Sequence, residues 1–159
     1  MPPPAQSSPI DPIKVFISYS HRDDELKTAF MTHLANLKRQ QKINAWSDRA
    51  IEGGEEWDTH IKQQLESAQI ILLLISPDFM ASDYCYDIEM QRAIARHDAG
   101  TARVIPVILR PTDWKDSPFS KLKALPNDGK PVTQWSDLDS AFLDVVKGIR
   151  TAVESLTKK

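Results

Sequence analysis

The chain lacks the features that mark several common classes of protein. Among its 159 residues there is one cysteine, Cys85, which excludes an internal disulfide framework and suits a reducing compartment. The longest apolar run, Ile70 to Ile75, is far too short to span a membrane. The formal net charge of −2 gives no reason to expect a surface for nucleic acid or for an anionic membrane. We therefore expect a cytoplasmic protein that binds no nucleic acid and no membrane.

Sequence motifs for tightly bound cofactors are also missing. There is no Gly-x-Gly-x-x-Gly fingerprint and no Walker loop, so neither a resident dinucleotide nor a P-loop phosphate site is expected. The four histidines are scattered, and none has an acid or thiol partner at the spacing of metal ligands. We expect no cofactor and no metal.

The amino-terminal segment is rich in proline and has no basic region followed by an apolar stretch. It therefore does not resemble a secretion signal. We expect a disordered leader over residues 1–11 and one folded domain over residues 12–157.

Strand-like and helix-like patterns alternate along the rest of the chain. Helical periodicity starts near residues 20, 55, 82 and 136, with capping boxes at Ser20/Asp23 and Ser136/Asp139. Such alternation predicts an α/β domain with a flavodoxin-like five-stranded parallel sheet in the order 2-1-3-4-5 and helices on both faces. The five strand-like runs are residues 13–18, 43–46, 70–75, 103–109 and 131–133. Pro106 lacks a donor, which places the fourth run near a sheet edge or a bulge.

This strand order predicts where a ligand binds. The crevice of such a sheet lies between the carboxyl ends of strands one and three, here residues 18–20 and 76–78. Glu89 is expected about two turns into the helix that follows the buried central strand. It is either a catalytic carboxylate or a surface charge paired with Arg92, three residues further on.

Three blocks of the sequence resemble the signature blocks of the TIR (Toll/interleukin-1 receptor) domain, in the same order and spacing. They are Phe16-Ile-Ser-Tyr-Ser-His-Arg-Asp-Asp24, Trp46-Ser-Asp-Arg-Ala-Ile-Glu-Gly-Gly-Glu-Glu-Trp57 and Ile75-Ser-Pro-Asp-Phe-Met-Ala-Ser-Asp-Tyr-Cys-Tyr-Asp-Ile-Glu-Met90. The resemblance is closer to prokaryotic TIR domains than to those of animal receptors, and it implies the flavodoxin-like sheet predicted above.

The resemblance also implies an activity. Many TIR domains cleave NAD+ between nicotinamide and ribose with one glutamate, and Glu89 falls on that position. Nicotinamide leaves as a neutral molecule, so one carboxylate that stabilises the ribosyl cation is enough, whereas ordinary glycosidases need two. Attack by water gives ADP-ribose, and attack by a group of the same nucleotide gives a cyclic isomer. Replacing Glu89 by alanine or glutamine is expected to abolish nicotinamide release and to leave the melting temperature nearly unchanged.

Further residues are candidates for binding NAD+, each with a plainer alternative. Tyr19 either stacks on a base or packs against a loop, and Arg49 meets a pyrophosphate, a neighbouring subunit or only solvent. Trp46 and Trp57 fit a core at least as well as a ligand contact, and Cys85 fits a small packed residue at a helix start. The full set is Tyr19, Ser20, Trp46, Asp48, Arg49, Trp57, Ser76, Tyr84 and Cys85.

The resemblance implies partners as well. The loop Ser47 to Gly54 corresponds to a family loop that takes part in self-association, so other TIR domains are expected partners, with a fused sensor or effector domain as a further expectation. Activation by self-association would suit signalling or defence. The competing hypothesis is a non-catalytic scaffold that only binds other TIR domains. A different nucleotide reaction, such as nucleic-acid processing, is disfavoured because a basic face is lacking.

Overall fold

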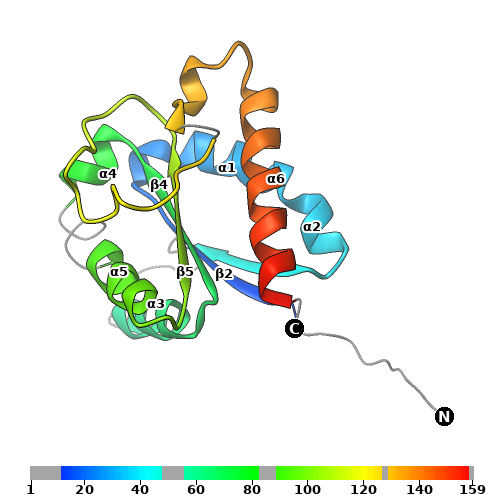
Figure 1. The fold of residues 1–159 in the computed structure, drawn as a ribbon, viewed down its shortest axis with the longest axis vertical. Helices are drawn as coiled ribbons and strands as arrows, with labels where there is room; N and C mark the ends of the chain where they lie inside the picture. Colours follow the sequence, from blue (N-terminus) through cyan, green and yellow to red (C-terminus); the bar gives the residue numbers. More distant parts are fainter. Residues whose placement is uncertain (1–11, 48–55, 83–88, 127–128, 158–159) are drawn as a thin grey trace.

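A parallel sheet of four strands organises the described part of the chain (Figure 1). The computed structural model describes residues 12–47, 56–82, 89–126 and 129–157, with residues 56–61 described in backbone only. The strands are β2 (Ile13–Ser18), β3 (Ile43–Ser47), β4 (Ile70–Ile75) and β5 (Arg103–Ile108), in the spatial order β3-β2-β4-β5. All three pairings are parallel, so the predicted α/β class and the order 2-1-3-4 of the first four strands are confirmed.

Helices cover both faces of this sheet, as predicted. One face carries α1 (Asp24–His33), α2 (Ala35–Arg39) and the long α6 (Leu138–Thr157). The other carries α3 (Glu56–Ser67), α4 (Pro77–Ala81) and α5 (Gln91–Asp98). Figure 1 shows the two groups on opposite sides of the strands. Within the described residues, no helix is both long and apolar enough to cross a membrane.

The central strand β4 is buried along its whole length. All six of its side chains are fully covered, and they alternate between the two helical layers. Complete burial of an isoleucine or leucine contributes about 1.5–3 kcal/mol each, so this strand is a main source of stability. The prediction that Ile70 to Ile75 is central and fully buried is confirmed.

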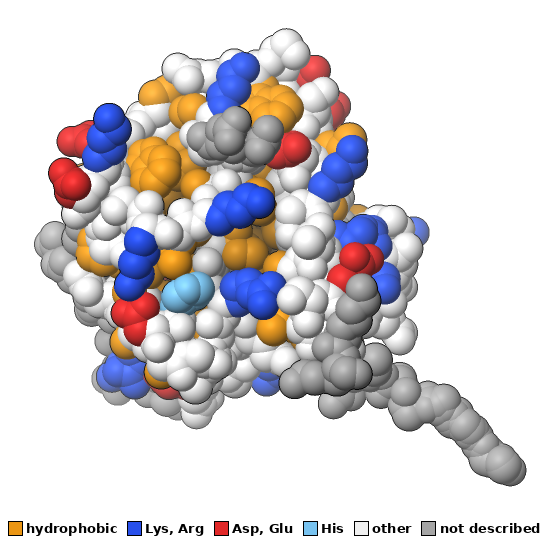
Figure 2. Space-filling model, viewed as in Figure 1, with side chains coloured by type: hydrophobic (Ala, Val, Ile, Leu, Met, Phe, Trp, Pro, Cys, Tyr) orange, Lys and Arg blue, Asp and Glu red, His pale blue; other side chains and the backbone are white. Residues whose placement is uncertain are grey.

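The predicted fifth strand at residues 131–133 is wrong. Val132–Gln134 forms the short 3-10 helix η4, in which Val132 is buried. On the outer side of β5, the described residues form one isolated bridge: the Leu125 N–H donates to the Pro106 carbonyl at 2.8 Å, and the Ile108 N–H donates to the Leu125 carbonyl at 2.8 Å. Pro126 follows at once and has no N–H to extend the pairing. In the described part of the chain, β5 is therefore an edge strand, as Pro106 suggested, and hydrophobic side chains stay visible on this face (Figure 2).

Two helix starts differ from those predicted. The short helix α4 begins at Pro77, ahead of the helical periodicity predicted from near residue 82, because the Ser76 hydroxyl accepts the Phe79 N–H at 3.0 Å. The last helix is capped by Asp137 instead of Ser136: its carboxylate accepts the Ser140 N–H at 2.7 Å and the Ser140 hydroxyl at 3.0 Å. Asp139, the other half of the predicted capping box, binds His33 of α1 at 3.0 Å.

Candidate functional site

Polar side chains gather at the carboxyl ends of neighbouring strands. Ser18 ends β2, and Ser76 directly follows β4, its neighbour in the sheet. The chain leaves β2 toward β3 on one side, while β4 and β5 lie on the other, which makes this edge the topological switch point of the sheet. Ligands of open α/β sheets bind at such points.

Glu89 lies at this edge and is fully buried. Its Oε1 accepts a hydrogen bond from the Ser18 hydroxyl at 2.5 Å, between groups 71 positions apart in the sequence. Glu89 directly precedes Met90 and α5, on the sheet face that α3 and α5 cover. The interpretation of Glu89 as a surface charge is wrong, because its side chain is covered and Arg92 forms its ion pair with Glu66 of α3.

Burial changes how strongly this carboxylate interacts with a nearby charge. A charge in a low-dielectric site interacts with a nearby cation far more strongly than a charge in water does. The hydrogen bond from Ser18 also fixes the direction of one carboxylate oxygen. A fixed, desolvated carboxylate is suited to stabilise a developing positive charge or to accept hydrogen bonds from ribose hydroxyls.

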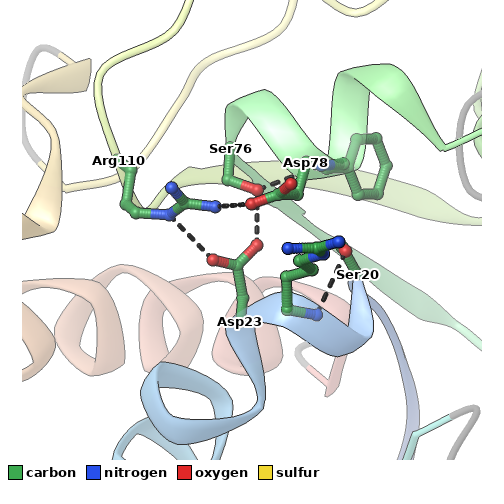
Figure 3. A network of polar contacts seen from close by, with 7 residues as sticks. Ser20, Asp23, Ser76, Asp78 and Arg110 are labelled. Atoms are coloured by element: carbon green, nitrogen blue, oxygen red, sulfur yellow. Dashed lines mark hydrogen bonds and ion pairs between the residues drawn. The ribbon is translucent and has the colours of Figure 1, made fainter.

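A second polar network lies at the same edge, centred on Asp23 (Figure 3). The Asp23 side chain is 1% exposed and accepts hydrogen bonds from Arg110 Nε at 2.8 Å and from the Ser76 hydroxyl. The same guanidinium also donates to Asp78. Burial lowers the pKa of Arg110, but its hydrogen bonds to Asp23 and Asp78 and the attraction of their negative charges together outweigh burial and raise that pKa above its ordinary value.

This network joins the segments that leave three strands. Asp23 follows β2, Ser76 and Asp78 follow β4, and Arg110 comes just after β5. It therefore fixes the relative positions of three strand ends beside Ser18 and Glu89. The Ser20/Asp23 capping box is only half correct: the Ser20 hydroxyl accepts the Arg22 N–H at 3.3 Å at the start of the 3-10 turn η1 (His21–Asp23), while the Asp23 carboxylate binds Arg110.

Ser18 and Asp78 lie in the crevice predicted from the sequence, residues 18–20 and 76–78, but neither was given a binding role. Arg110 was not singled out, and Asp23 was assigned only to a helix cap. One signal for them was available. Each of Ser18, Ser76 and Arg110 stands at the end of a buried strand or within two residues of it. Because the carboxyl ends of parallel strands share one edge, polar residues at these positions come together.

The structure places the predicted binding residues in different surroundings. Tyr19 is fully buried on the opposite face of the sheet from Ser18, where its hydroxyl donates to Asp24 at 3.0 Å and Lys27 Nζ lies 5.1 Å from the ring centre. Trp46 is partly buried and stacks on Phe16 with ring centres 5.4 Å apart. Ser76 joins the Asp23 network. The NAD+-binding roles of these residues stay predictions.

Other predicted residues lie outside what the structure describes. They are Asp48, Arg49, Tyr84, Cys85 and the side chain of Trp57, together with most of the loop Ser47 to Gly54 and the predicted leader over residues 1–11. Of that loop only Ser47 is described, and it is buried at the end of β3.

Comparisons with known proteins agree with the fold. A sequence model of the TIR domain family matches residues 15–143. The chain is 54% identical over 144 residues to the uncharacterized protein y4lF of Sinorhizobium fredii (strain NBRC 101917 / NGR234). The aligned region covers 91% of this chain and 45% of that protein. This chain thus spans a little under half the length of that relative. The TIR domain of the Toll-related receptor TRR-2 from Hydra magnipapillata matches with a TM-score of 0.60 and 21% identity, over 86% of this chain and 97% of that one.

Proposed function

The chain belongs to the TIR domain family, and on that premise we propose that it is an NAD+ nucleosidase with Glu89 as its catalytic residue. The observation that carries the proposal is the buried Glu89 carboxylate, held by Ser18 at the switch point of the sheet. A buried acid is costly to keep in a fold, and such groups gather at functional sites.

In the proposed reaction the bond between ribose C1′ and the nicotinamide nitrogen breaks, and its electron pair leaves with neutral nicotinamide. The ribosyl group becomes a cation resembling an oxocarbenium ion, which the Glu89 carboxylate stabilises. Water then attacks C1′ and loses a proton, giving ADP-ribose. Attack by a nucleophile of the same nucleotide gives a cyclic isomer instead.

The surroundings of Glu89 support this role in two ways. Ser18 orients Oε1, so less reorganisation is needed when charge develops. The Asp23–Arg110 network fixes the neighbouring strand ends, which keeps the positions of Ser18 and Ser76 constant.

Because Glu89 is fully covered, NAD+ reaches it only when the residues around it move, and we propose that self-association through the loop Ser47 to Gly54 favours that opening.

The same burial favours a second candidate function, a scaffold that binds other TIR domains without chemistry. In that case the pair of Ser18 and Glu89 serves only to fix α5 against β2. A cytoplasmic signalling or defence protein with a further fused domain fits either function.

One experiment separates the two functions. Concentrated protein is incubated with NAD+, and nicotinamide and the ribosyl product are separated by chromatography. The nucleosidase proposal predicts nicotinamide together with ADP-ribose or a cyclic isomer, in equal amounts and without added metal. A folded, self-associated protein that leaves NAD+ intact would instead establish the scaffold.

A further inference from the structure

A second concave site lies on the edge of the sheet, away from Glu89. A groove of about 420 Å³ opens beside β5, between the end of α5, the segment 121–125 and α6. Its apolar lining is aliphatic and consists of Val104, Ile105, Leu122, Leu125 and Ala152. Figure 2 shows hydrophobic side chains on this face with Lys, Arg and one His around them. The volume is in the range of small-molecule sites.

The groove exists because the sheet ends early. The bridge at Leu125 pairs with the carboxyl-terminal half of β5, and no described strand lies beside its first half. There the Val104 N–H donates to His97 Nδ1 at 3.2 Å, so this backbone donor at the sheet edge has a hydrogen-bond partner without a further strand. Helix α6 approaches at Gly148, where a Cβ atom would lie 2.6 Å from the Leu125 side chain.

The polar rim of the groove is basic. It is formed by His97, Arg103, Lys121 and Lys123. Lys121 is paired with Asp98 at 3.0 Å, whereas Arg103 donates only to the neutral Ser155 hydroxyl at 3.4 Å. Among the described residues, no carboxylate lies within ion-pair distance of Arg103 or Lys123. Since His97 Nδ1 accepts the hydrogen bond from Val104, the ring hydrogen is on Nε2, which acts as a donor.

We propose that this groove binds a small organic anion with an aliphatic body, such as a medium-chain carboxylate. The aliphatic walls take the chain, and Arg103 and Lys123 take the anionic head through charge-assisted hydrogen bonds. Among the described residues, the lining contains no phenylalanine, tyrosine or tryptophan on which a nucleotide base would stack. The proposal is independent of NAD+ cleavage, because the groove and Glu89 are separate sites.

The test titrates the whole chain with decanoate, below its micelle-forming concentration, and follows backbone amide resonances by NMR. Decanol supplies the same chain without a charge, and acetate supplies the charge without a chain. We expect saturable decanoate binding with shifts at Val104, Leu122 and Gly148, and much weaker binding of decanol and acetate.

Three variants locate the site. The double variant Arg103→Gln/Lys123→Gln should weaken decanoate binding roughly tenfold, as expected for losing two partly exposed charge-assisted contacts. The double variant Lys38→Gln/Arg39→Gln removes the same two residue types from the exposed end of α2 and should bind like the parent. Thr151→Phe, at an exposed position of the groove wall, should block binding and leave the melting temperature unchanged.

Several results would overturn the proposal. Decanol binding as tightly as decanoate would show an unspecific apolar patch. Unchanged affinity in the Arg103/Lys123 variant, or shifts confined to other surfaces, would place the anion elsewhere. A dimer that forms through this groove and is insensitive to decanoate would assign the surface to a second copy of the chain.

Discussion

At the scale of single residues, the hydrogen bond from Ser18 to Glu89 links the fold to its proposed chemistry. Ser18→Ala removes the donor to a buried carboxylate oxygen. We expect the free energy of unfolding to fall by about 1–3 kcal/mol, the cost of removing a partner from a buried acceptor. Urea unfolding measures this, and Ser67→Ala, at an exposed serine, should stay within about 0.5 kcal/mol of the parent. Equal stability of the two variants would contradict the role given to Ser18.

Arg110 makes a second prediction at this scale. Arg110→Ala leaves the Asp23 carboxylate buried without its cation. We expect a loss of about 3 kcal/mol in the free energy of unfolding, the lower end for a broken buried ion pair, because the Arg110 side chain is still 32% exposed. Arg92→Ala breaks the exposed pair with Glu66 and should cost less than about 1 kcal/mol. If the two variants unfolded at the same urea concentration, the Asp23 network would not be structural.

At the scale of elements, the start of α6 distinguishes the observed cap from the predicted one. Hydrogen bonds from the Ser140 N–H and hydroxyl lower the pKa of Asp137 below its ordinary value of 3.8. We expect Asp137→Ala to lower the melting temperature, whereas Ser136→Ala leaves it unchanged. A larger loss in Ser136→Ala would restore the predicted capping box.

The same cap predicts a pH dependence. A carboxylate whose pKa is lowered by folding stabilises the protein fully above its unfolded pKa, and the benefit is lost as pH falls through the folded value. The difference in melting temperature between the parent and Asp137→Ala should therefore be constant above about pH 5 and shrink below pH 4. Asp137→Asn keeps a capping oxygen without the titration, so its difference from Asp137→Ala should not depend on this pKa.

Strongly patterned elements were predictable from the sequence, and weakly patterned ones were not. Residues 70–75 form an unbroken apolar run, which is long enough for a strand buried on both faces and too short for a typical helix. Residues 131–133 offered three residues without a repeating pattern, and the structure instead has the 3-10 helix η4 at Val132–Gln134, which contacts α6. Ser136 and Asp137 are both good capping residues, so the local sequence could not decide between them.

At the scale of the whole molecule, the site follows from the strand order. The order 2-1-3-4 placed the switch point at Ser18 and Ser76, and Glu89 lies there. The links from Asp23 to Arg110 and from Arg92 to Glu66 were not predictable, because each joins segments far apart in the sequence. Side-chain pairing across the fold depends on packing geometry, which periodicity does not contain.

Self-association gives the prediction at this scale. The loop Ser47 to Gly54 is expected to dock against a second copy, which would couple activity to assembly. Nicotinamide release per molecule should therefore rise with protein concentration. Arg49→Ala and Gly53→Pro, in the part of the loop outside the described residues, should reduce both the activity and its concentration dependence. Constant specific activity across a wide dilution series would show that the monomer is sufficient.

The choice of variant at Glu89 follows from its burial. The sequence led us to expect a nearly unchanged melting temperature for Glu89→Ala. The structure instead predicts that Glu89→Ala lowers the melting temperature, because it removes most of a fully buried side chain and leaves a cavity. Glu89→Gln keeps the volume and an oxygen that accepts the Ser18 hydrogen bond, so it removes the charge alone.

The most direct test of the account is the rate of nicotinamide release from NAD+ by Glu89→Gln, compared at equal concentration with the parent and with Glu66→Gln. Glu66 is an exposed carboxylate on α3, so its variant is a matched control for removing one acid. We predict that Glu89→Gln loses at least about a hundredfold in rate, as removal of an electrostatic transition-state contact does, while Glu66→Gln matches the parent. A folded Glu89→Gln protein that releases nicotinamide at the parent rate would contradict the account.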